Sequence, residues 1–478
     1  MNSARRPALT IALLAAALVA ACGGGGGGNG PDQVAGIDRG GRTISQGPIN
    51  GFGSVIVNGV HYSTSGATIT IDGQPGTEAQ LRVGQVVRVE GTVDANGTTG
   101  IARSISFDDD VEGPVQSIDL AAARFVVLGQ TVQVGASTSF DDSIVPRSLD
   151  GLQVGDRVEV SGLVDAGGVI AATRVERGAA SGTVEVKGTA SAVNVAARRL
   201  AINGLTVDYS AATLDGFTGG QPANGDLIEA HGTVNGSGVL VATRLERRSP
   251  SLSGTTDDDA DLEGLVTRFV SATDFDVAGQ RVTTTATTRY EGGTAANLAL
   301  DVNVEVEGGF DTSGRIVATK VEFRRSSDVE FAGAVESVNL AANSLVLLGV
   351  TVRVNTLTRF EDQSDADVER FGLDDLRVGD YVEVRAYDDG TGLLATLLER
   401  DDPEASVELR GTASGVAAPD FSVAGVAVTT DAQTEYRDNN GVSITAAAFF
   451  ATAPGREVKV RGALVGNVVL ADRAELED

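Results

Sequence analysis

Short runs of alternating apolar and polar residues, separated by glycine-rich turns, recur along the chain from residue 44 onward. Residues 81–91 read Leu-Arg-Val-Gly-Gln-Val-Val-Arg-Val-Glu-Gly, and residues 152–162 repeat this order with a Gly-Asp pair before the strand. A period of two places successive side chains on opposite faces of a β-strand. The pattern therefore predicts strands with one buried face and one face in water, joined by tight hairpins.

One unit is written six times in succession, which is the signature of a repeat protein. The alternating string returns at residues 81–91, 152–162, 224–232, 302–308, 378–384 and 454–462. In the fourth copy Asp301 stands where the others have Gly, so we expect a different turn there. We place the repeats at residues 44–107, 111–176, 184–247, 262–325, 329–400 and 407–477.

Each repeat contains about five short strands. Its front half has a Gly-x-Val strand and then two strands that meet at a Gly, as in residues 125–132, and a Thr-x-aromatic step closes it in four copies. A polar segment follows, and we expect one turn of helix there at residues 148–154 and 367–376. Five strands with an insert at that point is the plan of a small OB-like barrel. The expected fold is all-β, a tandem array of about six such barrels. A small sandwich or an open meander is the alternative.

The first residues have the pattern of an export signal. Arg5 and Arg6 precede an apolar run over residues 8–21 that is too short to span a bilayer. The run ends in Val-Ala-Ala-Cys, which resembles the lipobox of bacterial lipoproteins. That resemblance implies that residues 1–21 are removed and that Cys22 carries lipid. An ordinary signal peptide with an incidental cysteine is the alternative.

Residues 22–43 begin with a run of glycines and are expected to form a flexible tether behind the lipid anchor. By analogy with lipoprotein sorting, Gly23 rather than Asp after the cysteine favours the outer membrane. The string of residues 154–162, Val-Gly-Asp-Arg-Val-Glu-Val-Ser-Gly, and Ala-Thr-Arg-Val-Glu at 172–176 add a second resemblance. With the lipobox and tether they look like bacterial lipoproteins that carry repeats of the domain of unknown function DUF5666. The resemblance implies a repeat array in the cell envelope, lipid-anchored on its periplasmic or surface face, and brings no catalytic residues.

Composition narrows the range of functions. The net charge of −28 repels phosphate backbones, so we expect no nucleic-acid partner. One cysteine and two histidines leave little for catalysis or cysteine-based metal sites. We interpret His61 and His231 as outward-facing strand residues. The sequence shows no Ser–His or Ser–Lys constellation that could activate a nucleophile. We therefore expect no enzyme activity and no cofactor.

Acidic and Gly/Ser-rich stretches lie between the repeats and are interpreted as hinges, residues 249–261 being the longest. Two of them offer the oxygen ligands that Ca²⁺ prefers, although neither has the spacing of an EF-hand loop. The Ca²⁺ candidates are Asp108, Asp109, Asp110, Asp257, Asp258, Asp259 and Asp261. A solvated charged hinge is the favoured interpretation of both clusters.

Together these features predict a non-catalytic, lipid-anchored envelope protein whose repeats act as a spacer, scaffold or binding module. Its partners would be the membrane, through the anchor, and an envelope protein or glycan that the sequence does not identify. The alternative is a ligand-binding or hydrolytic envelope protein in which one repeat is specialised.

Overall fold

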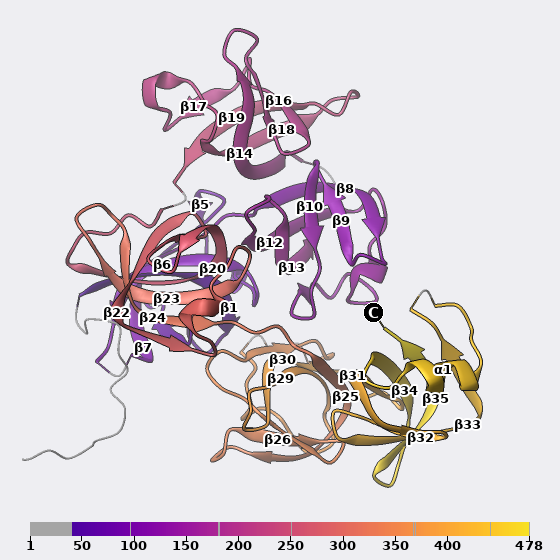
Figure 1. The fold of residues 1–478 in the computed structure, drawn as a ribbon. Coiled ribbons are helices and arrows are strands. Elements are labelled where there is room, and N and C mark those ends of the chain that lie inside the picture. Colours follow the sequence, from indigo (N-terminus) through magenta and orange to yellow (C-terminus); the bar gives the residue numbers. More distant parts are fainter. Residues whose placement is uncertain are drawn as a thin grey trace, which may run out of the picture. The chain divides into compact units, whose positions relative to one another are not determined.

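The computed structural model describes residues 41–95, 97–179, 182–249, 251–366, 368, 370–439 and 441–477 (Figure 1). The predicted signal peptide, Cys22 and the tether up to residue 40 lie outside the described residues. Nearly all regular elements in the described part are strands, as the alternating pattern predicts.

The first three repeats share one order of elements, in which a 3-10 helix separates the front strands from the last two. Repeat 1 contains β1 (Arg42–Gly51), β2 (Val55–Val57), β3 (Val60–Ser63), β4 (Thr68–Ile71), β5 (Gln74–Pro75), η1 (Glu78–Gln80), β6 (Val86–Val93) and β7 (Thr99–Phe107). Repeat 2 contains β8 (Val111–Asp119), β9 (Arg124–Val127), β10 (Gln130–Gln133), β11 (Ser139–Phe140), η2 (Leu149–Gly151), β12 (Arg157–Val164) and β13 (Ile170–Arg177). Repeat 3 contains β14 (Val184–Asn194), β15 (Arg199–Ile202), β16 (Leu205–Asp208), β17 (Thr213–Asp215), η3 (Thr218–Gly220), β18 (Leu227–Val234) and β19 (Leu240–Arg248).

The last three repeats keep the order of the strands, but only repeat 4 keeps the 3-10 helix: the described residues of repeat 5 have no helix at that point, and repeat 6 has the α-helix α1. Repeat 4 contains β20 (Asp258–Ser271), β21 (Asp274–Val277), β22 (Gln280–Glu291), η4 (Ala295–Asn297), β23 (Asn303–Phe310) and β24 (Ile316–Phe323). Repeat 5 contains β25 (Val329–Asn339), β26 (Ser344–Leu347), β27 (Val350–Arg353), β28 (Arg359–Asp362), β29 (Tyr381–Asp388) and β30 (Leu393–Asp401). Repeat 6 contains β31 (Val407–Ala417), β32 (Asp420–Val423), β33 (Val426–Arg437), α1 (Ala446–Thr452), β34 (Glu457–Val465) and β35 (Val468–Leu476).

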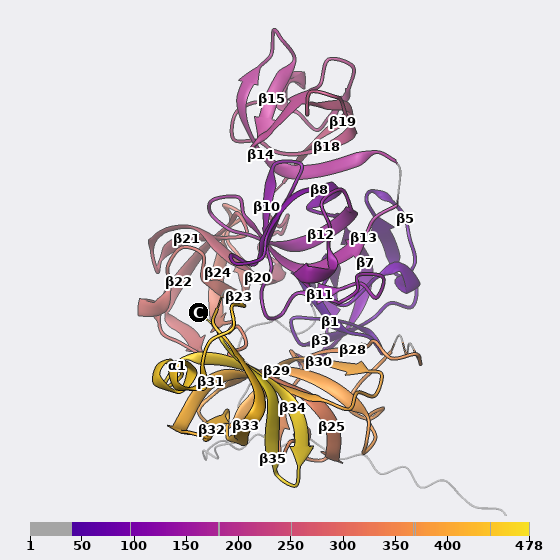
Figure 2. The ribbon, with the colours of Figure 1, turned by 90° about the vertical axis from the view of Figure 1, so that its right-hand side faces the viewer.

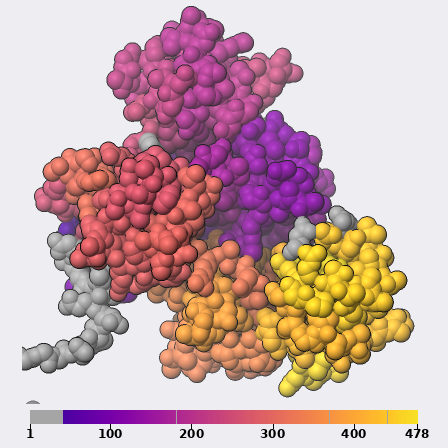
Figure 3. Space-filling model, viewed as in Figure 1, coloured from indigo at the N-terminus to yellow at the C-terminus, as the bar shows by residue number. Residues whose placement is uncertain are grey.

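Every repeat closes its sheet into a five-stranded barrel. In repeat 2, β8 pairs antiparallel with β9 and β12, β9 with β10, and β12 with β13, while β10 runs parallel to β13 and completes the ring. The other five repeats have the same circuit, which Figure 2 shows for the sixth repeat in yellow. This strand order confirms the OB-like barrel and excludes the sandwich and the open meander. The magenta atoms of repeat 3 form one compact body in Figure 3.

The predicted turn of helix between the third and fourth strands is confirmed at residues 148–154 by η2. It is wrong at residues 367–376, whose described residues form turns and no helix. The reason is that aspartates there bind nearby backbone groups: the N–H of Val368 donates to Asp362 at 2.8 Å and that of Gly372 to Asp375 at 3.0 Å. Such bonds compete with helical hydrogen bonding.

The expected difference in turn at Asp301 is also wrong. Asp301 adopts φ +65°, in the left-handed region that Gly155 occupies in repeat 2 with φ +98°. Its N–H donates to the Val266 carbonyl at 2.9 Å, the counterpart of the 2.8 Å bond from Gly155 to Val115. The turn is therefore kept, and aspartate is among the few residues besides glycine that tolerate this conformation.

The threonine of the Thr-x-aromatic step forms a hydrogen bond inside the barrel. The Thr138 hydroxyl donates to the Ala172 carbonyl on the last strand at 2.7 Å, and both groups are buried. Equivalent bonds in repeats 4, 5 and 6 start from Thr288, Thr358 and Thr434. The repeated threonine therefore satisfies a carbonyl that the parallel pairing of the third and fifth strands leaves without a partner.

Strand pairing also joins one repeat to another. β8 pairs with β14 antiparallel, β25 with β31 antiparallel, and β1 with β20 in parallel, so each sheet of 11 or 12 strands contains two barrels. The interpretation of residues 249–261 as a hinge is wrong for residues 258–261, because they form the start of β20 and pair with β1. Strand pairing thus links the described repeats in three pairs, 1 with 4, 2 with 3, and 5 with 6.

Candidate functional site

Four glutamates stand side by side on four adjacent strands that pass from repeat 2 into repeat 3. Glu176 lies opposite Glu159, Glu159 opposite Glu112, and Glu112 opposite Glu185. Like charges on directly paired residues of neighbouring strands destabilise a sheet, so nearby cations are needed to offset the repulsion among the four glutamates. Arg157 supplies one, because its guanidinium donates to Glu112 at 2.7 and 2.9 Å. Burial and the neighbouring carboxylates raise the pKa of Glu159 to about 7.

The row ends at His231 on β18. Its Nδ1 lies 3.1 Å from Oε2 of Glu185, and its Nε2 lies 2.7 Å from Oε1 of Glu229. Burial disfavours the charged ring, but the hydrogen bonds to both carboxylates prevail and raise the pKa of His231 to about 10. The imidazole is therefore held between two acids as a cation near neutral pH.

Glu229 is completely buried and binds a second cation, Arg248. The Nε of Arg248 donates to Oε2 of Glu229 at 2.6 Å, and its terminal nitrogen donates to Oε1 at 2.7 Å. Burial opposes ionisation, but the hydrogen bonds from His231 and Arg248 lower the pKa of Glu229 to about 2. Glu185 differs, because burial raises its pKa to about 7 and its Oε1 is buried without a hydrogen-bond partner.

The structure buries most of the first predicted Ca²⁺ cluster. Asp109 and Asp110 are each 5% exposed, so the interpretation of a solvated hinge is wrong for both. Asp110 accepts from Lys187 Nζ at 2.7 Å and from the N–H of Gly162 at 2.9 Å, while Asp108 pairs with Arg248 at 3.3 Å.

The second predicted cluster is divided between solvent and a strand. Asp257 is exposed, whereas Asp258, Asp259 and Asp261 are buried in β20. Asp258 pairs with Arg42 at 3.3 Å, and Asp261 accepts from the side-chain amide of Asn58 at 2.8 Å. The solvated hinge is therefore wrong for these buried residues as well.

The three residues Glu185, Glu229 and His231 each offer one ligand atom, and these atoms lie within 4.8 Å of one another. Across the described ranges, no other group of His, Cys, Asp or Glu has this spacing. The sequence reading missed the group, because it treated His231 as a lone outward-facing residue. The available signal was register: Glu229 and His231 are two residues apart on one strand face, and Glu185 lies in the strand that pairs with them. The chain's other histidine, His61, has its Nδ1 3.3 Å from Ser54 Oγ, and burial lowers its pKa.

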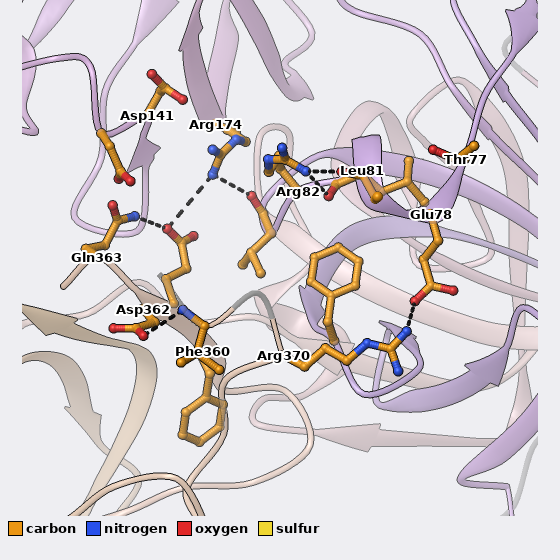
Figure 4. A pocket seen from close by; sticks show the side chains of 16 residues that line it. Thr77, Glu78, Leu81, Arg82, Asp141, Arg174, Phe360, Asp362, Gln363 and Arg370 are labelled. Atoms are coloured by element: carbon orange, nitrogen blue, oxygen red, sulfur yellow. Dashed lines mark hydrogen bonds and ion pairs between the residues drawn. The ribbon is translucent and has the colours of Figure 1, made fainter. Parts of the chain in front are cut away.

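A pocket of about 520 Å³ is a second candidate site, formed by side chains of repeats 1, 2 and 5 (Figure 4). Two aromatic rings, Phe52 and Phe360, line it together with charged groups. Arg370 pairs with Glu78 at 2.7 Å, and Arg174 donates to the Val83 carbonyl at 3.1 Å. The combination of rings with fixed polar groups suits a small polar ligand with an apolar face.

The ring order of the strands, its sixfold repetition and the pairing between repeats define a tandem array of closed OB-like barrels. Within the described part, no helix has the length and apolar character needed to cross a membrane. The family model of a domain of unknown function, DUF5666, matches the chain six times, at residues 43–106, 112–176, 182–246, 263–322, 332–399 and 410–475. The chain belongs to this family. No curated protein matches it.

Proposed function

We propose that this protein is a non-catalytic, lipid-anchored component of the cell envelope in which the repeat array acts as a spacer, scaffold or binding module. The observation that carries the proposal is the strand pairing between repeats, which joins barrels in twos along one chain. Repetition of one module with such contacts gives many similar surfaces held at fixed spacing, the property that repeat arrays use for binding and support.

The proposed anchor is Cys22, the chain's only cysteine, which follows the apolar run of residues 8–21. Several acyl chains on one residue are enough for stable membrane attachment. We place the protein at the outer membrane, on its periplasmic or surface face, because Gly23 follows the cysteine.

The anchor is tested by fatty-acid labelling of cells that express the full chain. Cys22→Ser is expected to abolish labelling and to move the protein to the soluble fraction, while the neighbouring Gly23→Ala keeps both labelling and membrane attachment. Labelling that persists in Cys22→Ser would show that this cysteine is not the anchor.

The scaffold role is tested by chemical cross-linking in the same cells, followed by affinity purification of the full chain. A net charge of −28 favours partners with basic surfaces, because opposite charges steer association. We expect an envelope protein or a glycan to be recovered with the wild type and to be depleted in Cys22→Ser. Recovery of the chain alone would count against a binding role and leave a spacer.

A second candidate function is ligand binding, and the pocket between Phe52 and Phe360 is the observation that favours it. Aromatic rings together with charged hydrogen-bonding groups suit a short glycan. Saturation-transfer NMR with envelope oligosaccharides tests this, with Arg82→Ala as the variant, because Arg82 is exposed at the pocket. Equal transfer to wild type and variant would rule the pocket out as the site.

A further inference from the structure

We propose that Glu185, Glu229 and His231 form a binding site for one divalent transition-metal ion, with Zn²⁺ as the best match. The site lies on two adjacent strands of repeat 3, β14 and β18. Glu185 pairs directly with His231 in the register of these strands, and Glu229 precedes His231 by two residues on the same face. A sheet therefore holds all three ligands without help from a loop.

The spacing of the donor atoms suits a small metal ion. The three ligand atoms lie within 4.8 Å of one another, and Nε2 of His231 is 2.7 Å from Oε1 of Glu229. In a tetrahedral zinc site with bonds of about 2.0–2.2 Å, ligand atoms are about 3.3 Å apart. The widest separation can exceed that distance by up to about 1.5 Å. Because Glu229 faces Nε2 of His231 and Glu185 faces Nδ1, a metal ion bound at one ring nitrogen requires the glutamate at the other nitrogen to reorient toward it.

An independent observation concerns the second carboxylate oxygen of Glu185. Glu185 is 5% exposed, and its Oε1 is buried with no hydrogen-bond partner. Leaving a carboxylate oxygen buried and without a hydrogen-bond partner is costly, and a bound ion would remove that cost. An ion at this group would take the free oxygen as a ligand.

The surroundings carry excess negative charge. Asp109 is buried beside Glu185, and its N–H donates to Asp72 at 3.3 Å. A divalent cation in this region would relieve repulsion among acids that the described cations leave unpaired.

A metal ion at this site would compete with the groups that hydrogen-bond the three ligand residues in the structure. Metal entry displaces the hydrogen bond between His231 and Glu229, so the ring nitrogen that binds must give up its proton. Metal binding at Oε1 of Glu229 also displaces the 2.7 Å bond from the terminal nitrogen of Arg248, while Arg248 can keep its 2.6 Å bond from Nε to Oε2. Arg248 then acts as a positioning residue that orients a ligating carboxylate.

The donor set selects among metals. One imidazole nitrogen and two carboxylates, with no thiolate, match Zn²⁺ and other divalent first-row ions. Ca²⁺ and Mg²⁺ prefer six or more oxygen ligands and gain nothing from the imidazole. This donor set is therefore not the oxygen-only site that Ca²⁺ would need in the acidic segments between repeats.

Isothermal titration of the full chain, purified in detergent and stripped with a chelator, tests the site with ZnCl₂ in mildly alkaline buffer. We expect one equivalent of Zn²⁺ to bind in the presence of excess Ca²⁺. His231→Ala is expected to weaken binding at least ~10-fold, since it removes a direct ligand. His61→Ala is the matched control, because it removes the chain's other histidine and is expected to bind like the wild type.

X-ray absorption of the zinc complex gives a readout that does not depend on any variant. One nitrogen and the remaining oxygen ligands near 2.0–2.2 Å are expected. An all-oxygen shell, equal affinity of wild type and His231→Ala, or no binding by the wild type would each overturn the proposal. If His231→Ala does not fold, as circular dichroism would show, Glu185→Gln takes its place, with the same loss expected.

Discussion

Gly462 lies at a position where the backbone of the fourth strand passes unusually close to that of the fifth. The register between β34 and β35 shifts between Arg461 and Gly462, which is the mark of a β-bulge. A Cβ added at Gly462 would lie closer than 3.0 Å to three backbone atoms, including the Ala471 Cα at 2.8 Å. Because backbone rather than side-chain atoms block this space, the strands themselves would have to separate.

We predict that Gly462→Ala destabilises repeat 6 by about 1–3 kcal/mol, the usual cost of inserting a methyl group into a filled space. Whole-chain unfolding of six barrels is not a two-state transition, so a local measurement is needed. Hydrogen exchange followed by mass spectrometry reports the opening of β34 and β35 directly. Exchange of peptides from residues 457–476 should accelerate about 5- to 150-fold in the variant, while peptides from repeats 1 to 4 should not change.

Repeat 5 supplies the matched control, since Ala386 occupies the same bulge position there. Ala386→Gly removes a buried methyl and adds chain freedom, so it should lower stability only modestly and for a different reason. Unchanged exchange in Gly462→Ala would refute the steric argument. Acceleration throughout repeats 1 to 4 would show instead that the variant acts on the chain as a whole.

Three further predictions concern single contacts. Thr138→Val should destabilise repeat 2 by about 1–2 kcal/mol, because the buried Ala172 carbonyl loses the hydroxyl that donates to it. The same hydrogen-exchange method measures this, and unchanged exchange would show that Thr138 does not stabilise the barrel. Asp301→Gly should slow hydrogen exchange of repeat 4, because about 1 kcal/mol of relieved left-handed strain outweighs the exposed bond that Asp301 accepts from the N–H of Ala166. Faster exchange would contradict that reasoning. Burial raises the pKa of Asp362, but hydrogen bonds from Arg400, Ser364 and the N–H of Val368 outweigh it and bring the pKa from 3.8 down to about 2. The contribution of these bonds is therefore present above the unfolded pKa of 3.8 and disappears as pH falls through 2. The advantage of wild type over Asp362→Asn, about 1–2 kcal/mol after solvent screening, should therefore shrink between pH 4 and pH 2 in acid unfolding, and a constant difference would refute the assignment.

The barrels could be predicted from the sequence because their determinants are local. Period-two alternation and glycine at turns act within a few residues, and both recur six times. Gly162 is an exception: the alternating string alone does not explain it, and the structure shows that glycine is needed there because the backbone of β13 lies within 2.5 Å of where a Cβ would be. The sequence of one strand carries no information on how close the backbone of the neighbouring strand lies.

The candidate metal site and the pairing between repeats depend on contacts far apart in sequence. Glu185 and His231 meet only because β14 and β18 pair in one particular register. Runs of aspartate such as residues 257–261 suggest solvated segments on composition alone, but Asp261 is buried where β20 lies against β1 and β23. Such contacts between distant residues arise only when the sheets assemble, so they produce no recognisable pattern within a short stretch of sequence.

The parallel pairing of β1 with β20 bypasses the length of chain between them. Residues 42–46 are bonded to residues 258–262, so a pull applied at the two ends of the protein passes from the first repeat directly to the fourth. The force then acts along the strands and loads the bonds between them in shear, all at once rather than one by one. Repeats 2 and 3, which lie between β1 and β20 in the sequence, bear no tension until the pairing of these two strands breaks, and the chain can then lengthen through them.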